Sequence, residues 1–209
     1  MAAGISTEGP VFVGSRDELE QELFRYIADL SATAIRSSGR FFVAVSGGSL
    51  PKILAAALSR GDVETDKWVV LYADERNVSL DDPESNDASF AAAVGEKVEG
   101  MTRLQISPNP GHVDAVAEEY EALLRKEVGD GGEKGGLGLD LVLLGMGPDG
   151  HTASLFPGHA LLDEKEKLVA PISDSPKPPP ERVTLTLPAI AAAKNVAFVI
   201  TGAAKHEPL

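Results

Sequence analysis

Residues 41–49 read FFVAVSGGS, an apolar run of strand length that ends in small polar residues. Five consecutive apolar residues are typical of a strand covered on both faces, as in a parallel sheet. The glycines favour a tight turn, and the apolar residues that continue to Leu58 predict a short helix. This strand–turn–helix unit indicates an α/β fold.

The same kinds of element recur on both sides of this unit. Residues 15–18, SRDE, form a capping box ahead of apolar residues at helical spacing, which predicts a helix over residues 16–37 that Gly39 ends. Further strands are predicted at residues 68–73, 103–106, 139–144, 182–187 and 196–201. Further helices are predicted after Ser85, over residues 112–128, from about residue 151 and from Pro188. We therefore expect a Rossmann-like, mostly parallel sheet with helices on both faces.

The composition is that of an acidic globular domain. The chain has 209 residues, of which 43% are hydrophobic and 24% charged, so we expect one domain over residues 1–209. Lys and Arg total 19 and Asp and Glu total 32, and the net charge of −13 argues against nonspecific nucleic-acid binding. The lack of cysteine excludes disulfides, iron–sulfur clusters and cysteine nucleophiles. The sequence shows no secretory signal and no apolar run of membrane length, so we expect a cytoplasmic protein that does not bind a membrane.

Polar or glycine-rich segments follow four of the predicted strands, after Val45, Ala73, Leu144 and Thr201. The carboxyl ends of parallel strands meet at one edge of a sheet, where ligands bind in such folds. We therefore expect these four segments to form a single crevice.

The first segment, Ser46-Gly47-Gly48-Ser49, is a candidate anion-binding turn. Exposed N–H groups and the positive end of the following helix dipole favour phosphate. The alternative is a tight turn in which Ser49 is only a helix N-cap, and the residues alone leave both open. The segment has neither a Walker A ending nor a dinucleotide fingerprint, so it does not indicate either nucleotide chemistry.

Cationic side chains near the other segments are candidate ligands for an anion. In Asp74-Glu75-Arg76, Arg76 could pair with a phosphate or sugar oxygen and Asp74 could orient a hydroxyl or a water. The alternative is a solvated charged turn. Arg182, after a proline-rich segment, and Lys205, after the last strand, are candidate phosphate partners, although such long side chains are usually solvated.

The third segment, GMGPDGH at residues 145–151, carries the candidate general base. Its glycines and proline impose an unusual backbone directly after a buried strand. His151 falls where a helix is predicted to begin, and a helix N-terminus disfavours the imidazolium ion, which leaves a ring able to accept a proton. Asp149 could orient this ring or a water. The alternative is a histidine that only packs or caps locally, and no spacing of histidines and carboxylates predicts a metal site.

Taken together, these segments resemble the 6-phosphogluconolactonase family, whose fold is shared with glucosamine-6-phosphate deaminase, ribose-5-phosphate isomerase and CoA transferases. The matching segments are SGGSLP (46–51), DER (74–76), SN (85–86), LLGMGPDGHTASLFP (143–157), RVTLT (182–186) and GAAK (202–205). The resemblance implies hydrolysis of 6-phospho-D-glucono-1,5-lactone to 6-phosphogluconate in the oxidative pentose phosphate pathway. The resemblance implies a small sugar-phosphate lactone as the substrate, and the reaction needs no cofactor. We expect the protein to be a monomer or a weak homo-oligomer.

The resemblance also implies roles for the candidate residues. His151 would activate water against the C1 carbonyl, the turn at residues 46–49 with Arg182 and Lys205 would hold the 6-phosphate, and Asp74 and Arg76 would line the sugar end. Members of the family continue past this lysine with a further helix and strand that contain tryptophan. The only tryptophan here is Trp68, so we expect C-terminal elements to be missing.

Two other functions remain open from the residues alone. A sugar-phosphate isomerase or aminosugar deaminase on the same fold would move a proton at carbon, for which the carboxylate of Asp74 could serve. A phosphosugar-binding module without catalysis would use the same anion site.

Overall fold

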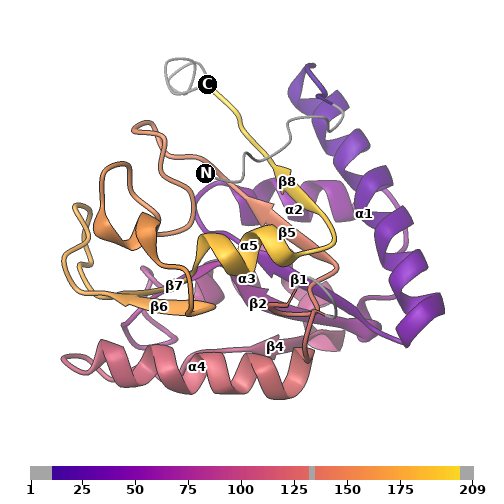
Figure 1. Cartoon of the computed structure of the whole chain (residues 1–209). Coiled ribbons are helices and arrows are strands. Elements are labelled where there is room, and N and C mark those ends of the chain that lie inside the picture. Colours follow the sequence, from indigo (N-terminus) through magenta and orange to yellow (C-terminus); the bar gives the residue numbers. More distant parts are fainter. Residues whose placement is uncertain (1–10, 132–134, 203–209) are drawn as a thin grey trace.

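The computed structural model describes residues 11–131 and 135–202, and these form two sheets flanked by helices (Figure 1). The main sheet has the strand order β4-β2-β1-β5-β8. Its strands are β1 (Phe41–Val45), β2 (Trp68–Tyr72), β4 (Thr102–Leu104), β5 (Leu141–Leu144) and β8 (Val196–Phe198). All four pairings between neighbours are parallel. The expectation of a mostly parallel sheet is confirmed.

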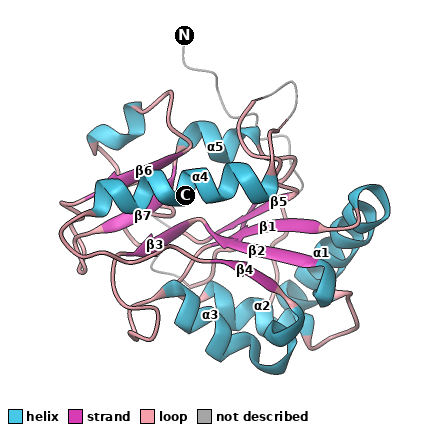
Figure 2. Cartoon of the chain, turned by 90° about the horizontal axis from the view of Figure 1, so that it is seen from below, coloured by secondary structure: helices cyan, strands magenta, loops and turns pink. Residues whose placement is uncertain are grey.

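Helices cover both faces of this sheet (Figure 2). One face packs against α1 (Arg16–Ser38), α2 (Leu50–Leu58) and α3 (Asn86–Val94), and the other against α4 (Val113–Val128) and α5 (Leu187–Ala192). Short 3₁₀ helices lie at η1 (Thr65–Lys67), η2 (Gly95–Gly100) and η4 (Ala160–Asp163). In the part of the chain that the structure describes, no helix is long and apolar enough to cross a bilayer.

The two-sided burial explains the unbroken apolar runs of the central strands. Val43 and Val45 belong to the hydrophobic cluster formed with α1, α2 and α3, whereas Ala44 between them belongs to the cluster formed with α4 and α5. Successive side chains of a strand point to opposite faces, so both sets of positions must be apolar here.

Both ends of helix α1 are set by local sequence. The side chain of Ser15 accepts a hydrogen bond from the Glu18 backbone while the Glu18 side chain accepts one from the backbone of Ser15. Gly39 ends the helix in the left-handed conformation, with φ of 78°. The helix predicted over residues 16–37 is therefore confirmed, one residue longer.

A second, antiparallel sheet lies beyond the ends of β1 and β2 and has the order β3-β7-β6. Its strands are β3 (Asp74–Arg76), β6 (Val169–Ile172) and β7 (Arg182–Leu185). Neither β3 nor β6 was predicted from the sequence, and β7 was predicted without its antiparallel partners. The chain leaves β2 and enters β3 after only Ala73, so the polar residues that follow β2 are paired rather than solvated.

The predicted helical turn from His151 is wrong. Thr152 and Leu155 form an isolated antiparallel bridge, and Ala153 between them is in the left-handed region with φ of 49°. Side-chain hydrogen bonds hold this turn, because Thr152 Oγ1 donates to the carbonyl of Gly145 at 2.9 Å and Ser154 Oγ donates to Asp74 at 2.8 Å. Such bonds compete with helix formation. His151 therefore does not lie at the N-terminus of a helix, and the expected helix dipole does not act on its ring.

Candidate active site

The candidate residues meet at the carboxyl end of the main sheet, around a pocket of about 230 Å³. Most of the predicted residues line it: Ser46, Gly47, Gly48, Ser49, Asp74, Arg76, His151 and Arg182. Gly145, Met146, Gly147, Pro148 and Ala153 complete the wall. Asp149 lies against His151, outside this wall. Lys205 lies outside the described residues.

The turn after β1 brings two serine side chains, Ser46 and Ser49, to the pocket wall. Ser46 is 6% exposed, and its Oγ has no hydrogen-bond partner among the described residues. Ser49 occupies the N-cap position of α2, but its side chain makes no capping hydrogen bond. Capping therefore does not account for Ser49, and the N-terminus of α2 opens on the pocket together with these hydroxyls.

Gly47 is required by the close approach of another element. A Cβ on this residue would lie 1.9 Å from Oδ1 of Asn86. Asn86 begins α3 and donates from Nδ2 to the carbonyl of Asp74 at 2.7 Å. The turn after β1 is thus packed directly against the β3–α3 connection.

Asp74 is a fixed carboxylate in the pocket wall. It is 5% exposed, and its Oδ2 accepts a hydrogen bond from Ser154 Oγ at 2.8 Å. Nη1 of Arg182 lies 3.9 Å from the same oxygen. This oxygen is already engaged, which makes it a poor acceptor for a substrate proton.

Glu75 points away from the pocket and caps α3. Its carboxylate accepts hydrogen bonds from the backbone N–H groups of Arg76 at 2.7 Å, Asn86 at 2.7 Å and Asp87 at 2.8 Å, and from Ser85 Oγ at 3.1 Å. Burial raises the pKa of Glu75, and the backbone hydrogen bonds oppose that rise. The alternative of a solvated charged turn at residues 74–76 is therefore wrong.

Two arginines form the cationic side of the pocket. Arg76 and Arg182 are directly paired in the β3–β7 register, so two like charges face each other. Burial, followed by the charge of Arg76, lowers the pKa of Arg182. Nε of Arg76 is buried without a partner among the described residues. An anion between these guanidinium groups would relieve their repulsion.

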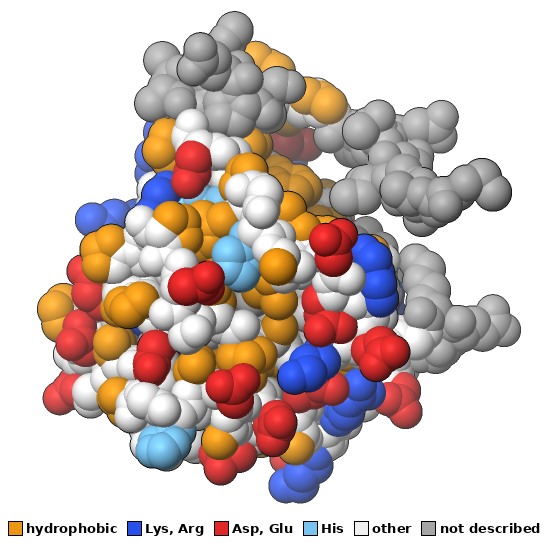
Figure 3. All heavy atoms as spheres, turned by 60° about the vertical axis from the view of Figure 1, so that its left-hand side comes forward, with side chains coloured by type: hydrophobic (Ala, Val, Ile, Leu, Met, Phe, Trp, Pro, Cys, Tyr) orange, Lys and Arg blue, Asp and Glu red, His pale blue; other side chains and the backbone are white. Residues whose placement is uncertain are grey.

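The chain as a whole is strongly acidic. Figure 3 shows acidic side chains spread over one face of the molecule, with Lys and Arg side chains gathered in only a few places. With a net charge of −13, the long-range field repels an anion, so binding must depend on local donors such as these arginines.

His151 is oriented from one side of its ring. Nδ1 lies 2.5 Å from Oδ1 of Asp149, and the ring lies over Phe156 with 4.7 Å between centroids. Burial alone would raise the pKa of Asp149, but hydrogen bonds from His151 and Lys177 outweigh it and hold the pKa well below its usual range. An ionised Asp149 can only accept, so Nδ1 carries a proton and Nε2 is left to take one up.

Gly147 lies so close to His151 that no side chain fits between them. A Cβ there would lie 2.1 Å from Cε1 and 2.2 Å from Nδ1 of the ring. Gly147, which the sequence predicts as part of an unusual backbone, is therefore needed so that the imidazole of His151 can occupy this position.

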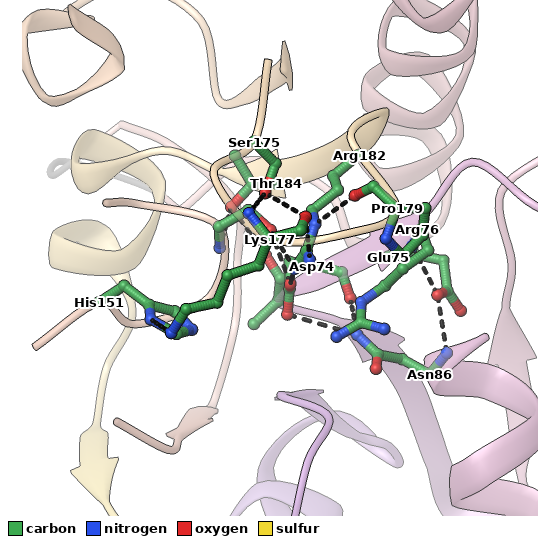
Figure 4. A network of polar contacts seen from close by, with 12 residues as sticks. Asp74, Glu75, Arg76, Asn86, His151, Ser175, Lys177, Pro179, Arg182 and Thr184 are labelled. Atoms are coloured by element: carbon green, nitrogen blue, oxygen red, sulfur yellow. Dashed lines mark hydrogen bonds and ion pairs between the residues drawn. The ribbon is translucent and has the colours of Figure 1, made fainter. Parts of the chain in front are cut away.

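Three residues of this arrangement have no role predicted from the sequence: Ser154, Asn86 and Lys177. Ser154 and Asn86 hold Asp74, and Lys177 holds Asp149. Figure 4 shows Asn86 beside Asp74. For Lys177 the sequence did contain a hint, because it is the one charged residue in the proline-rich stretch SPKPPP at 175–180 and has few local partners there.

The chain is similar to known proteins in its family model, its sequence and its structure. A family model described as glucosamine-6-phosphate isomerases/6-phosphogluconolactonase matches residues 14–209. The chain is 44% identical over 194 residues to a probable 6-phosphogluconolactonase of Schizosaccharomyces pombe, covering 88% of this chain and 75% of the relative. It is 42% identical over 199 residues to the 6-phosphogluconolactonase of Homo sapiens, covering 91% of this chain and 76% of the relative.

Solved structures resemble the whole described fold. A 6-phosphogluconolactonase from Shewanella baltica superposes with a TM-score of 0.82 at 26% identity, covering 96% of this chain and 85% of that one. The 6-phosphogluconolactonase from Trypanosoma brucei gives a TM-score of 0.77 at 27% identity, covering 93% and 82% respectively.

Proposed function

Because this chain belongs to the family of glucosamine-6-phosphate isomerases and 6-phosphogluconolactonases, we propose that it hydrolyses 6-phospho-D-glucono-1,5-lactone to 6-phosphogluconate. The observation that carries this proposal is a single pocket lined by His151 together with Ser46, Arg76 and Arg182. A ring ester with a phosphate at its far end needs a base at one end of the site and an anion holder at the other.

The chemistry follows from the orientation of His151. Nε2 takes a proton from water as the water oxygen bonds to C1 of the lactone. The bond from C1 to the ring oxygen then breaks, and the imidazolium returns its proton to that oxygen. Asp149 stabilises the transient imidazolium, as the carboxylate of a serine-protease triad does for its histidine. The products are the open-chain acid and an unchanged enzyme.

The phosphate would be held by hydroxyl, backbone and guanidinium donors. Ser46 Oγ and Arg76 Nε are the two buried side-chain atoms without a partner among the described residues. Leaving such groups unpaired is costly, so a ligand that accepts from both is favoured. We include Ser49, the glycines of the turn, Arg182 and Lys205 in this proposed anion site.

Asp74 supports the competing function of an isomerase or deaminase, because its carboxylate lines the same pocket. Its engagement by Ser154 and Arg182 favours a positioning role in this chain. Hydrolysis at His151 therefore fits the geometry better than proton transfer at carbon by Asp74.

The test compares two substrates. We expect acid release from freshly generated 6-phospho-D-glucono-1,5-lactone well above the spontaneous rate, and no ammonia from glucosamine 6-phosphate. Ammonia release without lactone hydrolysis would establish the deaminase. Saturable binding of 6-phosphogluconate without either reaction would indicate a binding module and overturn the proposal.

A further inference from the structure

The ammonium group of Lys177 lies beside the dyad formed by Asp149 and His151. Figure 4 shows the side chain of Lys177 extended toward His151. Nζ is 3.0 Å from Oδ1 of Asp149 and 3.2 Å from Nδ1 of His151. The same carboxylate oxygen thus receives both the imidazole and the ammonium. Lys177 does not line the pocket, so any effect on the reaction passes through the dyad.

Because of where the protons lie, Asp149 and Lys177 act on the His151 ring in opposite ways. Nδ1 carries the proton that it donates to Asp149, and it therefore cannot accept one from Lys177. When Nε2 takes a second proton, the ring becomes a cation that faces the ammonium. The carboxylate favours this imidazolium and the ammonium opposes it.

The place of Lys177 is fixed by its backbone. Its carbonyl accepts hydrogen bonds from Nη2 of Arg182 at 2.9 Å and from Ser175 Oγ at 2.9 Å. Arg182 is 3% exposed and also donates to the carbonyls of Pro178 and Pro179. One buried arginine of the pocket wall therefore holds the loop that brings the ammonium to the dyad.

We propose, on the basis of the proposed function, that Lys177 is a positioning residue that holds Asp149 against Nδ1 and keeps His151 from retaining the proton that it takes from water. The other charged groups that line the pocket, within residues 11–131 and 135–202, are Asp74, Arg76 and Arg182. Of these, Arg182 lies over the ring of Phe156, with 5.8 Å from its Cζ to the ring centroid. His151 packs on the same Phe156 ring. Among the residues that the structure describes, Lys177 and Asp149 are the charged groups in contact with the imidazole.

Loss of the ammonium should stabilise the imidazolium. In Lys177→Gln we expect the acid limb of the kcat/KM profile for lactone hydrolysis to move to higher pH by about one unit. Lys177→Arg, which keeps the charge, should retain the wild-type limb. Lys126→Gln is the matched control, because it makes the same change in net charge at a side chain that is 79% exposed on α4.

A merely structural role for Lys177 would lower kcat or the melting temperature without moving the limb, and that result would overturn the proposal. Titration of the His151 ring protons by NMR provides a second readout that needs no turnover. The same upward shift in Lys177→Gln is expected there, and an unchanged titration would also refute the inference. If the glutamine variant does not fold, Lys177→Met takes its place with the same expected shift. Wild-type protein that hydrolyses no lactone would instead refute the proposed function.

Discussion

Replacing Gly147 by alanine should displace His151 and remove most of the hydrolysis while the fold persists. The new methyl group would lie 2.1 Å from Cε1, and ordinary contact begins at 3.4 Å, so the ring must move by about 1.3 Å. A misplacement of about 1 Å in a catalytic group costs about 100-fold in rate, equal to about 2.7 kcal/mol. The ring can make this movement because its side chain is 17% exposed and bordered by the pocket.

The assay is the initial rate of hydrolysis of freshly generated 6-phospho-D-glucono-1,5-lactone, corrected for the spontaneous rate. Circular dichroism should show a folded protein, with a melting temperature lowered by about 2 to 4 °C for about 1 kcal/mol. Gly100→Ala is the control, since its methyl group would meet Asp66 at an ordinary 3.4 Å and should leave the rate unchanged. A Gly147→Ala variant with wild-type kcat/KM would refute the prediction that a side chain at position 147 displaces the His151 ring.

Three further predictions concern the anion site, α3 and Asp149. Ser46→Ala should raise KM about tenfold, because a hydrogen bond to a charged ligand is lost. The melting temperature should stay unchanged, because Ser46 Oγ has no partner among the described residues. An unchanged KM would exclude Ser46 from the anion site. Glu75→Gln should lower stability by about 2 kcal/mol, or about 4 to 8 °C in melting temperature, because one of its two oxygens is replaced by a donor that faces N–H groups; an unaltered thermal transition would contradict its capping role. The pKa of Asp149 is lower in the folded state than its ordinary value of 3.8, so its contribution to stability is present above that value and is lost as the pH falls below it. The difference in melting temperature between wild type and Asp149→Asn should therefore be largest near neutral pH and shrink in acid, and a difference independent of pH would contradict the ion pair.

Local patterns were sufficient for the main sheet. The capping box at Ser15, the αL glycine at Gly39 and the apolar run at residues 41–45 act over a few residues, and each marks an element that the structure contains. The parallel arrangement also follows, since strands that are apolar at every position must be buried on both faces. For this reason the predicted loops after β1, β2 and β5 do meet at one pocket.

Contacts between distant segments could not be read from these patterns. Asp74 looks like a surface charge in the sequence, but it is buried by Ser154, which is 80 positions away. Lys177 reaches Asp149 across 28 positions, through a loop whose shape depends on Arg182. The turn at residues 151–155 was predicted as helical because side-chain hydrogen bonds to Gly145 and Asp74 are invisible to a local rule.

The base assignment of His151 is tested most directly by His151→Ala, with hydrolysis and ligand binding measured on the same protein. We expect hydrolysis of the fresh lactone to fall by about 10² to 10⁴-fold toward the spontaneous rate, while calorimetry still detects 6-phosphogluconate binding with unchanged affinity. Turnover equal to that of the wild type would contradict the central claim.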